Sequence, residues 1–347
     1  MQPNLIIRAD ANAQVGTGHL MRCLALAQSW KTRGGEATFI TCCESRSLPQ
    51  SLADAGMQVV TLESAHPNPM DWKLTSQILQ RHSNGWVVLD GYHFDPEYQR
   101  QVKKGGLPLL VIDDTAHLEH YHADIVLNQN IGADLLRYSS EPDTLLLLGS
   151  QYVLLRPEFL SRGASRIRIP GIARKVLITL GGADADNQTL KVIQAVKKID
   201  IAGFEAVVVV GSNNPHRPQL QVESRDSTVP IAIVTNATNM DELMAWADLA
   251  ISGGGSTCWE LAFMGLPALV IILADNQRAV AEGLDEAGIV VSLGWHNNLN
   301  ATDITQALLS LAGEMDARTE MSQRGRQLID GRGNDRVVSK LLARCSN

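Results

Sequence analysis

Val15-Gly16-Thr17-Gly18-His19-Leu20-Met21-Arg22 is the stretch that decides the fold of this chain. It follows Leu5–Asp10, a short apolar run typical of a β-strand, and it leads into Leu20–Trp30, whose apolar residues recur at helical spacing. The sequence therefore predicts a strand, a glycine turn and a helix, with His19 in the first turn of that helix. In an open α/β sheet, such a turn faces the crevice in which ligands bind.

The residue types in this turn suit a functional site. Gly16 and Gly18 allow the backbone to come close to a ligand, and a helix N-terminus favours an anion. A histidine there can also move protons near neutral pH, and Arg22 lies three residues after His19 on the same helix face. A tight turn with a polar helix start explains the same residues without a ligand. The spacing does not fit a dinucleotide fingerprint, which would need glycine at Met21.

Length and charge restrict the class of protein. A chain of 347 residues is long for one core and suits two domains. Its apolar content is ordinary and its charges are mixed, so we expect a soluble globular protein. The net charge of -7 argues against a general nucleic-acid binder. An anionic substrate must then be held by a local positive field.

Cysteine usage and the lack of export signals favour a cytoplasmic protein. The five cysteines include no C-x-x-C pair, and Cys23 and Cys258 lie on predicted apolar helix faces, so we expect reduced, buried thiols. The N-terminus shows no apolar region behind a basic segment, which argues against a signal peptide. No apolar run approaches the length of a membrane span.

Strand-like runs alternate with helical stretches in both halves of the chain, which predicts parallel strands joined by crossover helices. In the first half, the predicted strands are Leu5–Ala9, Ala37–Cys42, Gln58–Leu62, Trp86–Asp90, Leu109–Asp113 and Ile125–Asn128, and the helices are Leu20–Arg33, Leu48–Ala55, Trp72–Arg81 and Pro96–Lys104. In the second half, the strands are Val176–Leu180, Ala206–Val210, Ile231–Val234, Leu249–Ser252, Ala268–Ile272 and Ile289–Leu293, and the helices are Thr189–Lys198, Met240–Ala247, Thr257–Met264, Arg278–Ala287, Ile304–Leu311 and Val337–Arg344. Polar residues end several strands of the first half, at the edge where ligand groups collect: Asp10, Asp90, Asp113 with Asp114, and Asn128.

The alternation lapses near Arg156–Arg174, a polar and basic segment interrupted by proline and glycine, which is the best linker in the chain. We therefore expect two α/β domains with a cleft between them. The N-terminal domain would span residues 1–157 and the C-terminal domain residues 172–332. For the helix in residues 333–347, packing back on the N-terminal domain is one possible arrangement.

Two more glycine turns occur in the second half. Leu180-Gly181-Gly182-Ala183-Asp184 follows the first strand there, and it either makes a plain strand-to-helix turn or offers backbone amides to a phosphate or sugar. Gly253-Gly254-Gly255 also follows a strand and opens a helix with Ser256 and Thr257. This second turn suits a diphosphate, because the helix amides and dipole favour an anion and both hydroxyls can donate to it.

Acidic and amide residues near these turns have two interpretations. Thr257-x-x-Glu260 fits a capping box, although an acidic residue beside a nucleotide turn can also accept both ribose hydroxyls. Asp275-Asn276-Gln277 opens the next helix, where we expect Asp275 or Asn276 to act as the N-cap. A further role in holding sugar or phosphate is compatible with capping.

His117, His120 and His122 form the only histidine cluster in the sequence. Zinc needs a set of three or four ligands, and this segment has the composition of a polar loop, so no metal is expected there. The sequence contains no Walker lysine turn and no G-x-S-x-G elbow.

Together, these features resemble the GT-B fold, in which the parallel sheets of two Rossmann-like domains face each other across a cleft. Ile251–Asn276 is similar to the nucleotide-sugar site of MurG-type N-acetylglucosaminyltransferases, through Gly253-Gly254-Gly255, Glu260, Gly265-Leu266-Pro267 and Asn276-Gln277. Other motifs resemble the PseG family, which hydrolyses UDP-2,4-diacetamido-2,4,6-trideoxy-β-L-altropyranose. These motifs are Arg8-Ala9-Asp10, Gly16-x-Gly18-His19-x-x-Arg22, Leu89-Asp90-Gly91-Tyr92, Ile112-Asp113-Asp114, Leu127-Asn128-Gln129-Asn130, Gly149-x-x-Tyr152-x-Leu154-Leu155-Arg156-Pro157-Glu158-Phe159 and Gly181-Gly182-x-Asp184.

The resemblance to PseG implies a UDP-sugar hydrolase of pseudaminic acid biosynthesis that uses neither a metal nor a cofactor. Water would attack the anomeric carbon, and UDP would leave by C–O cleavage with inversion. The resemblance implies that His19 is the general base, that Tyr92 positions water or sugar and that Glu260 holds the ribose. Asn276 is implied as a further catalytic residue on the sugar side. The other implied substrate contacts are Gly16, Gly18, Arg22, Gly181, Gly182, Asp184, Gly255, Ser256, Thr257 and Gln277.

The chemistry of these residue types is consistent with that reaction. UDP is a good leaving group, so the site must stabilise charge on the diphosphate and deprotonate a water molecule. His19 and the nucleotide turns lie on different predicted domains, whose closure would exclude other water. Two alternatives remain. One is a MurG-like UDP-sugar glycosyltransferase with an unknown acceptor, and the other is a non-catalytic nucleotide-sugar sensor.

Overall fold

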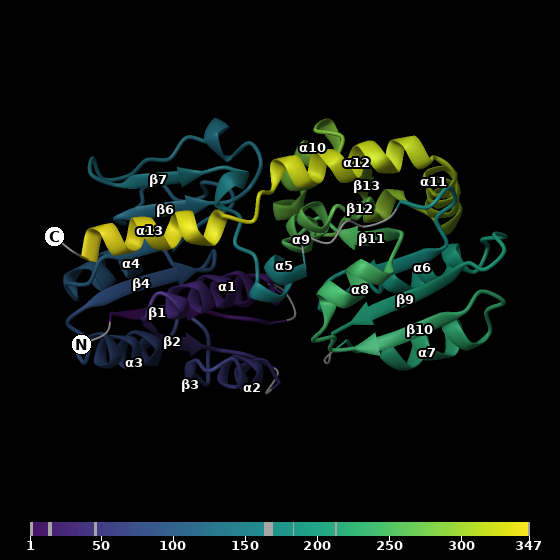
Figure 1. Ribbon diagram of the computed structural model, residues 1–347. Helices are drawn as coiled ribbons and strands as arrows, with labels where there is room; N and C mark the ends of the chain where they lie inside the picture. Colours follow the sequence, from purple (N-terminus) through teal and green to yellow (C-terminus); the bar gives the residue numbers. More distant parts are fainter. Residues whose placement is uncertain are drawn as a thin grey trace. The chain divides into compact units, whose positions relative to one another are not determined.

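Two compact units make up the chain in the computed structural model, which describes residues 3–12, 16–44, 47–162, 169–182, 184–211 and 214–345. The first unit comprises Met1–Pro157 together with Gly331–Asn347, and the second comprises Glu158–Asp330. Each unit contains one parallel β-sheet with helices around it (Figure 1). The predicted α/β architecture of both halves is confirmed.

The first unit is built on a seven-stranded sheet of order β3-β2-β1-β4-β5-β6-β7, in which all neighbours are parallel. The order reverses between β1 and β4, so the topological switch point lies at their carboxyl ends. The strands are β1 (Asn4–Ala9), β2 (Glu36–Thr41), β3 (Gln58–Thr61), β4 (Gly85–Asp90), β5 (Leu109–Ile112), β6 (Ile125–Asn128) and β7 (Leu145–Leu148). The helices are α1 (Gly18–Thr32), α2 (Ser47–Asp54), α3 (Pro69–Leu79), α4 (Pro96–Lys104) and α13 (Gly333–Cys345), with 3-10 turns η1 (Ala133–Leu135) and η2 (Ser150–Tyr152).

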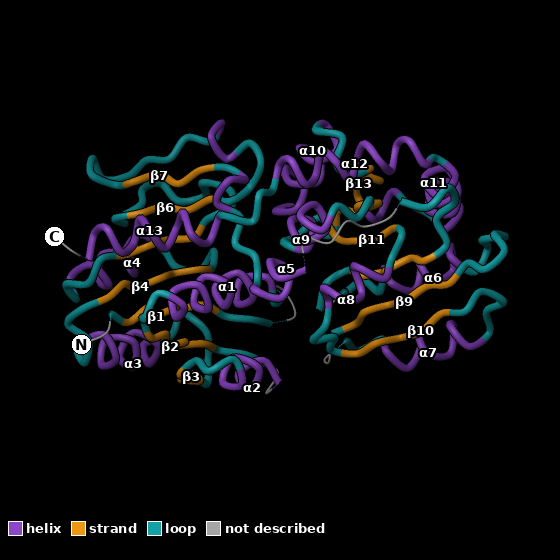
Figure 2. The backbone as a smooth tube through the Cα atoms, in the orientation of Figure 1, coloured by secondary structure: helices purple, strands orange, loops and turns teal. Residues whose placement is uncertain are grey.

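The second unit has a six-stranded parallel sheet of order β10-β9-β8-β11-β12-β13, with its switch point between β8 and β11. Its strands are β8 (Lys175–Thr179), β9 (Glu205–Val210), β10 (Ile231–Thr235), β11 (Leu249–Gly253), β12 (Ala268–Ile272) and β13 (Val291–Trp295). Its helices are α5 (Pro157–Arg162), which begins at the boundary, α6 (Gln188–Val196), α7 (Arg217–Arg225), α8 (Met240–Trp246), α9 (Thr257–Met264), α10 (Arg278–Glu286), α11 (Ala301–Gly313) and α12 (Met315–Leu328), with 3-10 turns η3 (Asp275–Gln277) and η4 (His296–Asn298). Figure 2 shows the same alternation of strand and helix along both units.

Helices α1 and α13 lie side by side over one face of the first sheet (Figures 1 and 2). Leu20 and Trp30 of α1 are buried in the same apolar core as Val337 and Leu341 of α13. The indole of Trp86 in β4 also donates to the carbonyl of Leu341, at 3.0 Å. Each such buried side chain contributes roughly 1.5–3 kcal/mol, so the end of the chain helps to hold α1 on the sheet.

Several elements were missing from the sequence prediction. Strand β7 is a leucine run on the sheet edge with no alternating pattern, and α7 has only Leu220 buried, so neither gave a periodic signal. Helix α12 was also missed, because its buried positions include Arg318 and Gly325 rather than an apolar stripe. The segment predicted as a linker contains α5, while residues 163–168 lie outside the described residues. Strand β13 begins at Val291, two residues later than predicted.

The two cysteines predicted on apolar helix faces are both fully buried, Cys23 in α1 and Cys258 in α9. Burial raises the pKa of both thiols, so they stay protonated at neutral pH. Neither takes part in a disulfide. These cysteines therefore act as small core side chains.

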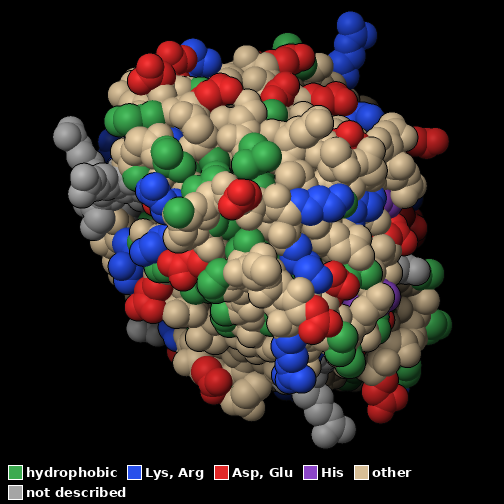
Figure 3. Space-filling view, turned by 90° about the vertical axis from the view of Figure 1, so that its right-hand side faces the viewer, with side chains coloured by type: hydrophobic (Ala, Val, Ile, Leu, Met, Phe, Trp, Pro, Cys, Tyr) green, Lys and Arg blue, Asp and Glu red, His purple; other side chains and the backbone are tan. Residues whose placement is uncertain are grey.

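Along the described segments, no helix has both the length and the apolar character needed to cross a membrane. On the face shown in Figure 3, acidic and basic side chains lie interspersed, and neither sign dominates the part drawn in colour. That face offers no extended basic surface of the kind that nucleic-acid binding requires.

Helix α12 packs closely on α9 because Gly325 has no side chain. A Cβ at Gly325 would lie 2.8 Å from the carbonyl oxygen of Ala262 in α9, closer than such atoms can approach. At Gly313, the last residue of α11, a Cβ would meet no described heavy atom within 4 Å. A methyl group therefore has space at the exposed Gly313 but not at the buried Gly325.

We expect Gly325→Ala and Gly313→Ala to change stability in opposite directions. Gly313→Ala should raise the free energy of unfolding by about 0.5–1 kcal/mol, because alanine loses less backbone entropy on folding. Gly325→Ala should lower it by about 1–3 kcal/mol, because the new methyl group forces α9 and α12 apart. Urea unfolding of both variants measures the difference. Equal stabilisation by both would contradict the close contact between these helices.

Candidate functional site

Asp90 is the centre of the polar cluster at the switch point of the first sheet. It ends β4 beside β1 and is fully buried. Its carboxylate accepts hydrogen bonds from Nε and Nη2 of Arg22, both at 2.7 Å, and contacts Nδ1 of His19 at 2.5 Å. Helix α1 presents His19 and Arg22 together because they are three residues apart on one helix face. The prediction that His19 lies in the first turn of this helix is confirmed.

The contact with Asp90 defines which nitrogen of His19 can act as a base. An ionised carboxylate only accepts hydrogen bonds, so we assign the proton of the neutral ring to Nδ1, which donates it to Asp90. Nη2 of Arg22, 3.1 Å from the same nitrogen, then donates to Asp90 rather than to His19. The lone pair is then on Nε2, which can take a proton from another group. His19 is 6% exposed and is held by this contact, and a fixed tautomer of this kind is what a general base requires.

Asp114 extends the cluster to the neighbouring strands. Arg22 donates to both of its carboxylate oxygens, at 2.7 and 3.0 Å. Tyr92 donates its hydroxyl to Asp114 at 2.7 Å, and Asn130 donates its amide at 2.9 Å. The Tyr92 ring also meets the His19 ring edge-on, with 5.2 Å between their centres. Loops after β4, β5 and β6 thus supply Tyr92, Asp114 and Asn130, and Asp114 joins the other two to the guanidinium of Arg22.

The charges of this cluster stabilise one another. Burial alone would raise the pKa of Asp90, but the Arg22 guanidinium and the contact with His19 hold it well below its usual range. The pKa of Asp114 is lowered in the same way, with burial again opposed mainly by Arg22. For Arg22, burial opposes the charge but the two carboxylates raise its pKa further. Arg22 is therefore a fixed cation whose guanidinium is already occupied by two carboxylates.

A second buried cluster fixes the end of β1 next to Asp90. Arg8 donates to Asp71 at 3.0 Å and to Asp10 at 2.8 Å, and Nε2 of His93 lies 3.0 Å from Asp10. Burial opposes the charge of Asp10, but His93 and Arg8 lower its pKa to about 2. These contacts hold the carboxyl end of β1 rigidly, directly before the glycine turn that leads to His19.

His117 lies apart from the other two histidines of its sequence cluster. Its Nδ1 is 2.8 Å from Asp113, and its Nε2 is 3.2 Å from the carbonyl oxygen of Tyr92. The hydrogen bond to Asp113 raises the pKa of His117. The three histidines therefore do not form one ligand set; His117 instead supports the loop that carries Tyr92.

Of the two glycines in the first turn, Gly16 alone has a positive φ. Gly16 has φ of +74° and its amide donates to the carbonyl of Asn12 at 2.9 Å. Gly18 is the first residue of α1, and Thr17 before it makes no side-chain capping bond to the helix. Val15 lies outside the described residues. Whether Gly16, Gly18 and Arg22 bind substrate stays a prediction.

In the second unit, the predicted turn after β8 is partly explained by its own contacts. Gly181 has φ of +88°, and a Cβ on the neighbouring Gly211 would lie 2.1 Å from the carbonyl oxygen of Gly182. Asp184 accepts hydrogen bonds from the amides of Gln188 and Thr189, at 2.7 and 2.8 Å, at the start of α6. The carboxylate of Asp184 thus caps a helix, a role that needs no ligand. Ala183 lies outside the described residues.

The capping box considered for Thr257 and Glu260 is wrong. Helix α9 begins at Thr257 after Ser256, whose φ and ψ are already helical and whose side chain makes no capping bond. Thr257 is then inside the helix rather than at its cap, and Glu260 falls one position too late for a capping box.

The expected N-cap at Asp275 or Asn276 is also wrong. The cap positions are Ala274 for η3 and Gln277 for α10, and no side-chain capping bond is made at either. The side-chain carbonyl of Gln277 instead accepts from the amides of Gly254 and Leu273, both at 3.0 Å. Gln277 therefore ties the turn after β11 to the turn after β12.

The two glycine turns of the second unit follow neighbouring strands. β8 pairs with β11, and Thr179 at the end of β8 lies opposite Ser252. The Gly181 turn and the Gly253–Thr257 turn thus leave the same edge of the sheet at its switch point, where α/β proteins bind ligands. Helix α9 directs its N-terminus to this edge, which suits an anion.

Some residues of these clusters were missing from the predicted site. Asp90 and Asp114 were noticed as polar strand ends and within longer motifs, and Asn130 within a longer motif, but none was predicted as a site residue. Their position after adjacent strands was the available signal, because the carboxyl ends of parallel strands meet at one edge. Nothing in the sequence showed that one arginine would join the two carboxylates.

Comparison with known proteins supports the fold. Residues 175–331 match the glycosyltransferase family 28 C-terminal domain. The crystal structure of Acinetobacter baumannii MurG is similar to 98% of this chain and 99% of its own, with a TM-score of 0.65 and 16% sequence identity. The structural similarity to MurG and the two parallel sheets show that the chain has the GT-B fold predicted from the sequence.

Three curated proteins are similar to this chain in sequence. The spore coat polysaccharide biosynthesis protein SpsG of Bacillus subtilis is 25% identical over 96% of both chains. The UDP-2,4-diacetamido-2,4,6-trideoxy-beta-L-altropyranose hydrolase of Campylobacter jejuni is 22% identical over 83% of this chain and 98% of its own. An uncharacterised protein of Methanocaldococcus jannaschii, MJ1062, is 26% identical over 79% of this chain, which spans only 56% of that relative's length.

The first unit should lose stability in acid because its buried aspartates are ionised. The folded pKa of Asp10 is about 2, against about 3.9 in an unfolded chain. Because the folded pKa is the lower one, the stabilisation is complete above about pH 4 and is lost as the pH falls towards 2. For Asp10 alone this amounts to about 2 kcal/mol.

Urea unfolding between about pH 6 and pH 3 measures this loss. Asp10→Asn should reduce the pH dependence, whereas Asp134→Asn, at an exposed position, should leave it as in the wild type. An Asp10→Asn variant with the full wild-type dependence would contradict this assignment.

Proposed function

We propose that this chain is an enzyme that hydrolyses a UDP-linked sugar, with UDP-2,4-diacetamido-2,4,6-trideoxy-β-L-altropyranose as the proposed substrate. The observation that carries the proposal is the buried Asp90–His19 pair at the switch point of the first sheet. The relationship to the Campylobacter jejuni hydrolase along nearly its whole length supports the choice of substrate. The reaction would yield the free sugar and UDP.

In the proposed mechanism, the first unit supplies the base. Nε2 of His19 accepts a proton from water while Asp90 holds the ring and stabilises the imidazolium that forms. The water oxygen bonds to the anomeric carbon as the bond from that carbon to the UDP oxygen breaks, and the bonding pair leaves with UDP. Tyr92, fixed by its bond to Asp114 beside His19, would position the water or the sugar. Arg22 acts as a positioning residue through the two carboxylates.

The second unit would bind the leaving group. The start of α9, with Ser256 and Thr257, and the Gly181 turn offer amide and hydroxyl donors to the diphosphate as its charge grows. Glu260, an acidic residue in the first turn of α9, would accept the ribose hydroxyls. Asn276 would meet the sugar side, and Gln277 would keep the two turns together.

Glycosyl transfer is the second candidate. The match of residues 175–331 to a glycosyltransferase domain and the likeness to MurG support transfer. This support is as strong as the support for hydrolysis from the Campylobacter jejuni hydrolase. Both reactions need the same UDP contacts, and they differ only in the group that attacks the anomeric carbon. A transferase needs an acceptor hydroxyl, whereas a hydrolase releases UDP in water alone.

A screen of UDP-sugars in the absence of any acceptor separates the two candidates. We expect the chain to release UDP from the diacetamido sugar and to produce the free sugar. Release of UDP only after an acceptor is added would favour transfer. Tight UDP binding without turnover of any sugar would overturn both enzymatic proposals.

We expect His19→Gln to lower turnover by about 10²–10⁴-fold, because water then lacks its base. Affinity for UDP should change little, since the proposed UDP contacts lie in the second unit. Turnover measured as UDP release, with UDP binding followed by calorimetry, tests both statements. His82→Gln, outside the cluster, serves as the matched control and should keep wild-type turnover. Near wild-type turnover of His19→Gln would show that His19 is not the base.

A further inference from the structure

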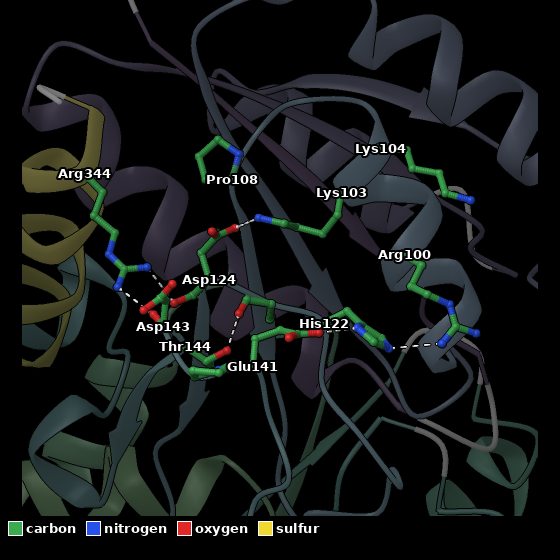
Figure 4. A pocket seen from close by; sticks show the side chains of 12 residues that line it. Arg100, Lys103, Lys104, Pro108, His122, Asp124, Glu141, Asp143, Thr144 and Arg344 are labelled. Atoms are coloured by element: carbon green, nitrogen blue, oxygen red, sulfur yellow. Dashed lines mark hydrogen bonds and ion pairs between the residues drawn. The ribbon is translucent and has the colours of Figure 1, made fainter.

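His120, His122 and Glu141 form a cluster of ligating side chains in the first unit that the proposed function does not use. Each offers one ligand atom, and these atoms all lie within 4.8 Å of one another. The cluster adjoins a pocket of about 790 Å³ at the amino ends of β5, β6 and β7, to which Pro108, Asp124 and Thr144 contribute (Figure 4). The Asp90 cluster lies at the opposite, carboxyl edge of the same sheet.

The backbone itself brings these three side chains to one side. Tyr121 and Ser140 form an isolated parallel bridge between the loops that precede β6 and β7. Successive residues of an extended chain point to opposite faces, so the residues flanking the bridge share a face. Tyr121 is fully buried, which directs its neighbours His120 and His122 outward, where Glu141 also lies.

Hydrogen bonds hold this arrangement. The amide of Tyr121 donates to the carbonyl of Ser139 at 2.8 Å, and the amide of His122 donates to the buried side chain of Gln99 at 2.9 Å. The Ser139 hydroxyl lies 2.9 Å from Nδ1 of His120. A partner on this nitrogen is the kind of second contact that orients a metal-binding imidazole, and it leaves Nε2 of His120 for a metal.

The three ligand atoms lie within 4.8 Å of one another, and the two distances from Glu141 are close to those of a tetrahedral site. Bonds of about 2.0–2.2 Å from a zinc ion to nitrogen or oxygen place neighbouring ligand atoms about 3.3–3.4 Å apart. Oε1 of Glu141 lies 3.3 Å from Nε2 of His120 and 2.7 Å from Nδ1 of His122. The distance from Glu141 to His120 already fits. The distance from Glu141 to His122 must widen by about half an ångström, which these partly exposed side chains can do.

We propose that His120, His122 and Glu141 bind a divalent transition-metal ion of borderline softness, with Zn²⁺ as its representative. Two imidazoles and one carboxylate are ligands that zinc accepts, and the partial exposure of the three side chains leaves a fourth position for water. The ion would join the loop before β6 to the loop before β7. This proposal is independent of the proposed hydrolysis and needs none of its residues.

Arg100 makes a hydrogen bond that competes with metal binding at this site. Its Nη1 lies 3.1 Å from Nε2 of His122, and Figure 4 shows it reaching His122 from α4. When a metal occupies Nδ1, the proton of the neutral ring must move to Nε2, where it faces another donor. Metal binding therefore requires Arg100 to turn away, towards Glu97, to which it already donates at 2.7 Å.

Calorimetric titration of the tag-free chain with Zn²⁺ tests the proposal. We expect one ion per chain, with an affinity that falls about tenfold or more in His120→Gln, His122→Gln and Glu141→Gln. Arg100→Gln should strengthen binding, because its amide oxygen can accept the Nε2 proton of His122. His82→Gln, the matched control, should bind as the wild type does. Zinc should also raise the unfolding temperature of the wild type but not of the ligand variants.

Three results would overturn the proposal. They are the absence of Zn²⁺ binding, unchanged binding in all three ligand variants, and a thiolate charge-transfer band after Co²⁺ is substituted, which would place the metal on a cysteine. The ligand variants are at partly exposed positions, and their far-UV circular dichroism shows whether they are folded. Loss of zinc binding with unchanged UDP release, or the converse, separates this proposal from the proposed function.

Discussion

The burial of Asp90 is the constraint on which the first unit depends. A carboxylate without exposed surface at a strand end is tolerated only if it is paired, and removal of one partner from such a pair costs about 3–5 kcal/mol. Arg22 supplies the charge, and it reaches Asp90 because the first turns of α1 lie at the carboxyl ends of β1 and β4. The same helix placement brings His19 to the carboxylate. The position of the candidate base thus follows from the need to neutralise a buried charge.

The switch point of the second unit, between β8 and β11, offers different groups from that of the first unit. It carries glycine turns and the start of α9 rather than paired charges. Backbone amides and a helix dipole suit an anionic ligand, whereas a buried carboxylate beside a histidine suits proton transfer. The strand order of the second sheet matches that of the first six strands of the first sheet, but the two switch points offer different groups.

Much of this could be predicted from the sequence. The alternation of apolar runs gave both parallel sheets, and the strand ends pointed to Asp90 and Asp114. Contacts between residues distant in sequence could not be predicted in this way. Periodicity does not show that the Arg22 guanidinium is shared by two carboxylates, or that Gln277 ties two turns together. The predicted capping box at Glu260 was wrong because α9 begins one residue earlier than the box requires, with Ser256 rather than Thr257 at the N-cap position.

The central claim is that water, activated by His19, replaces UDP at the anomeric carbon. Turnover of the UDP-diacetamido sugar in ¹⁸O-labelled water, followed by mass spectrometry of both products, tests it most directly. The account predicts that the label enters the free sugar and that UDP stays unlabelled, because the bond between the anomeric carbon and the UDP oxygen breaks. Label in UDP, or a sugar product that carries no label, would contradict it.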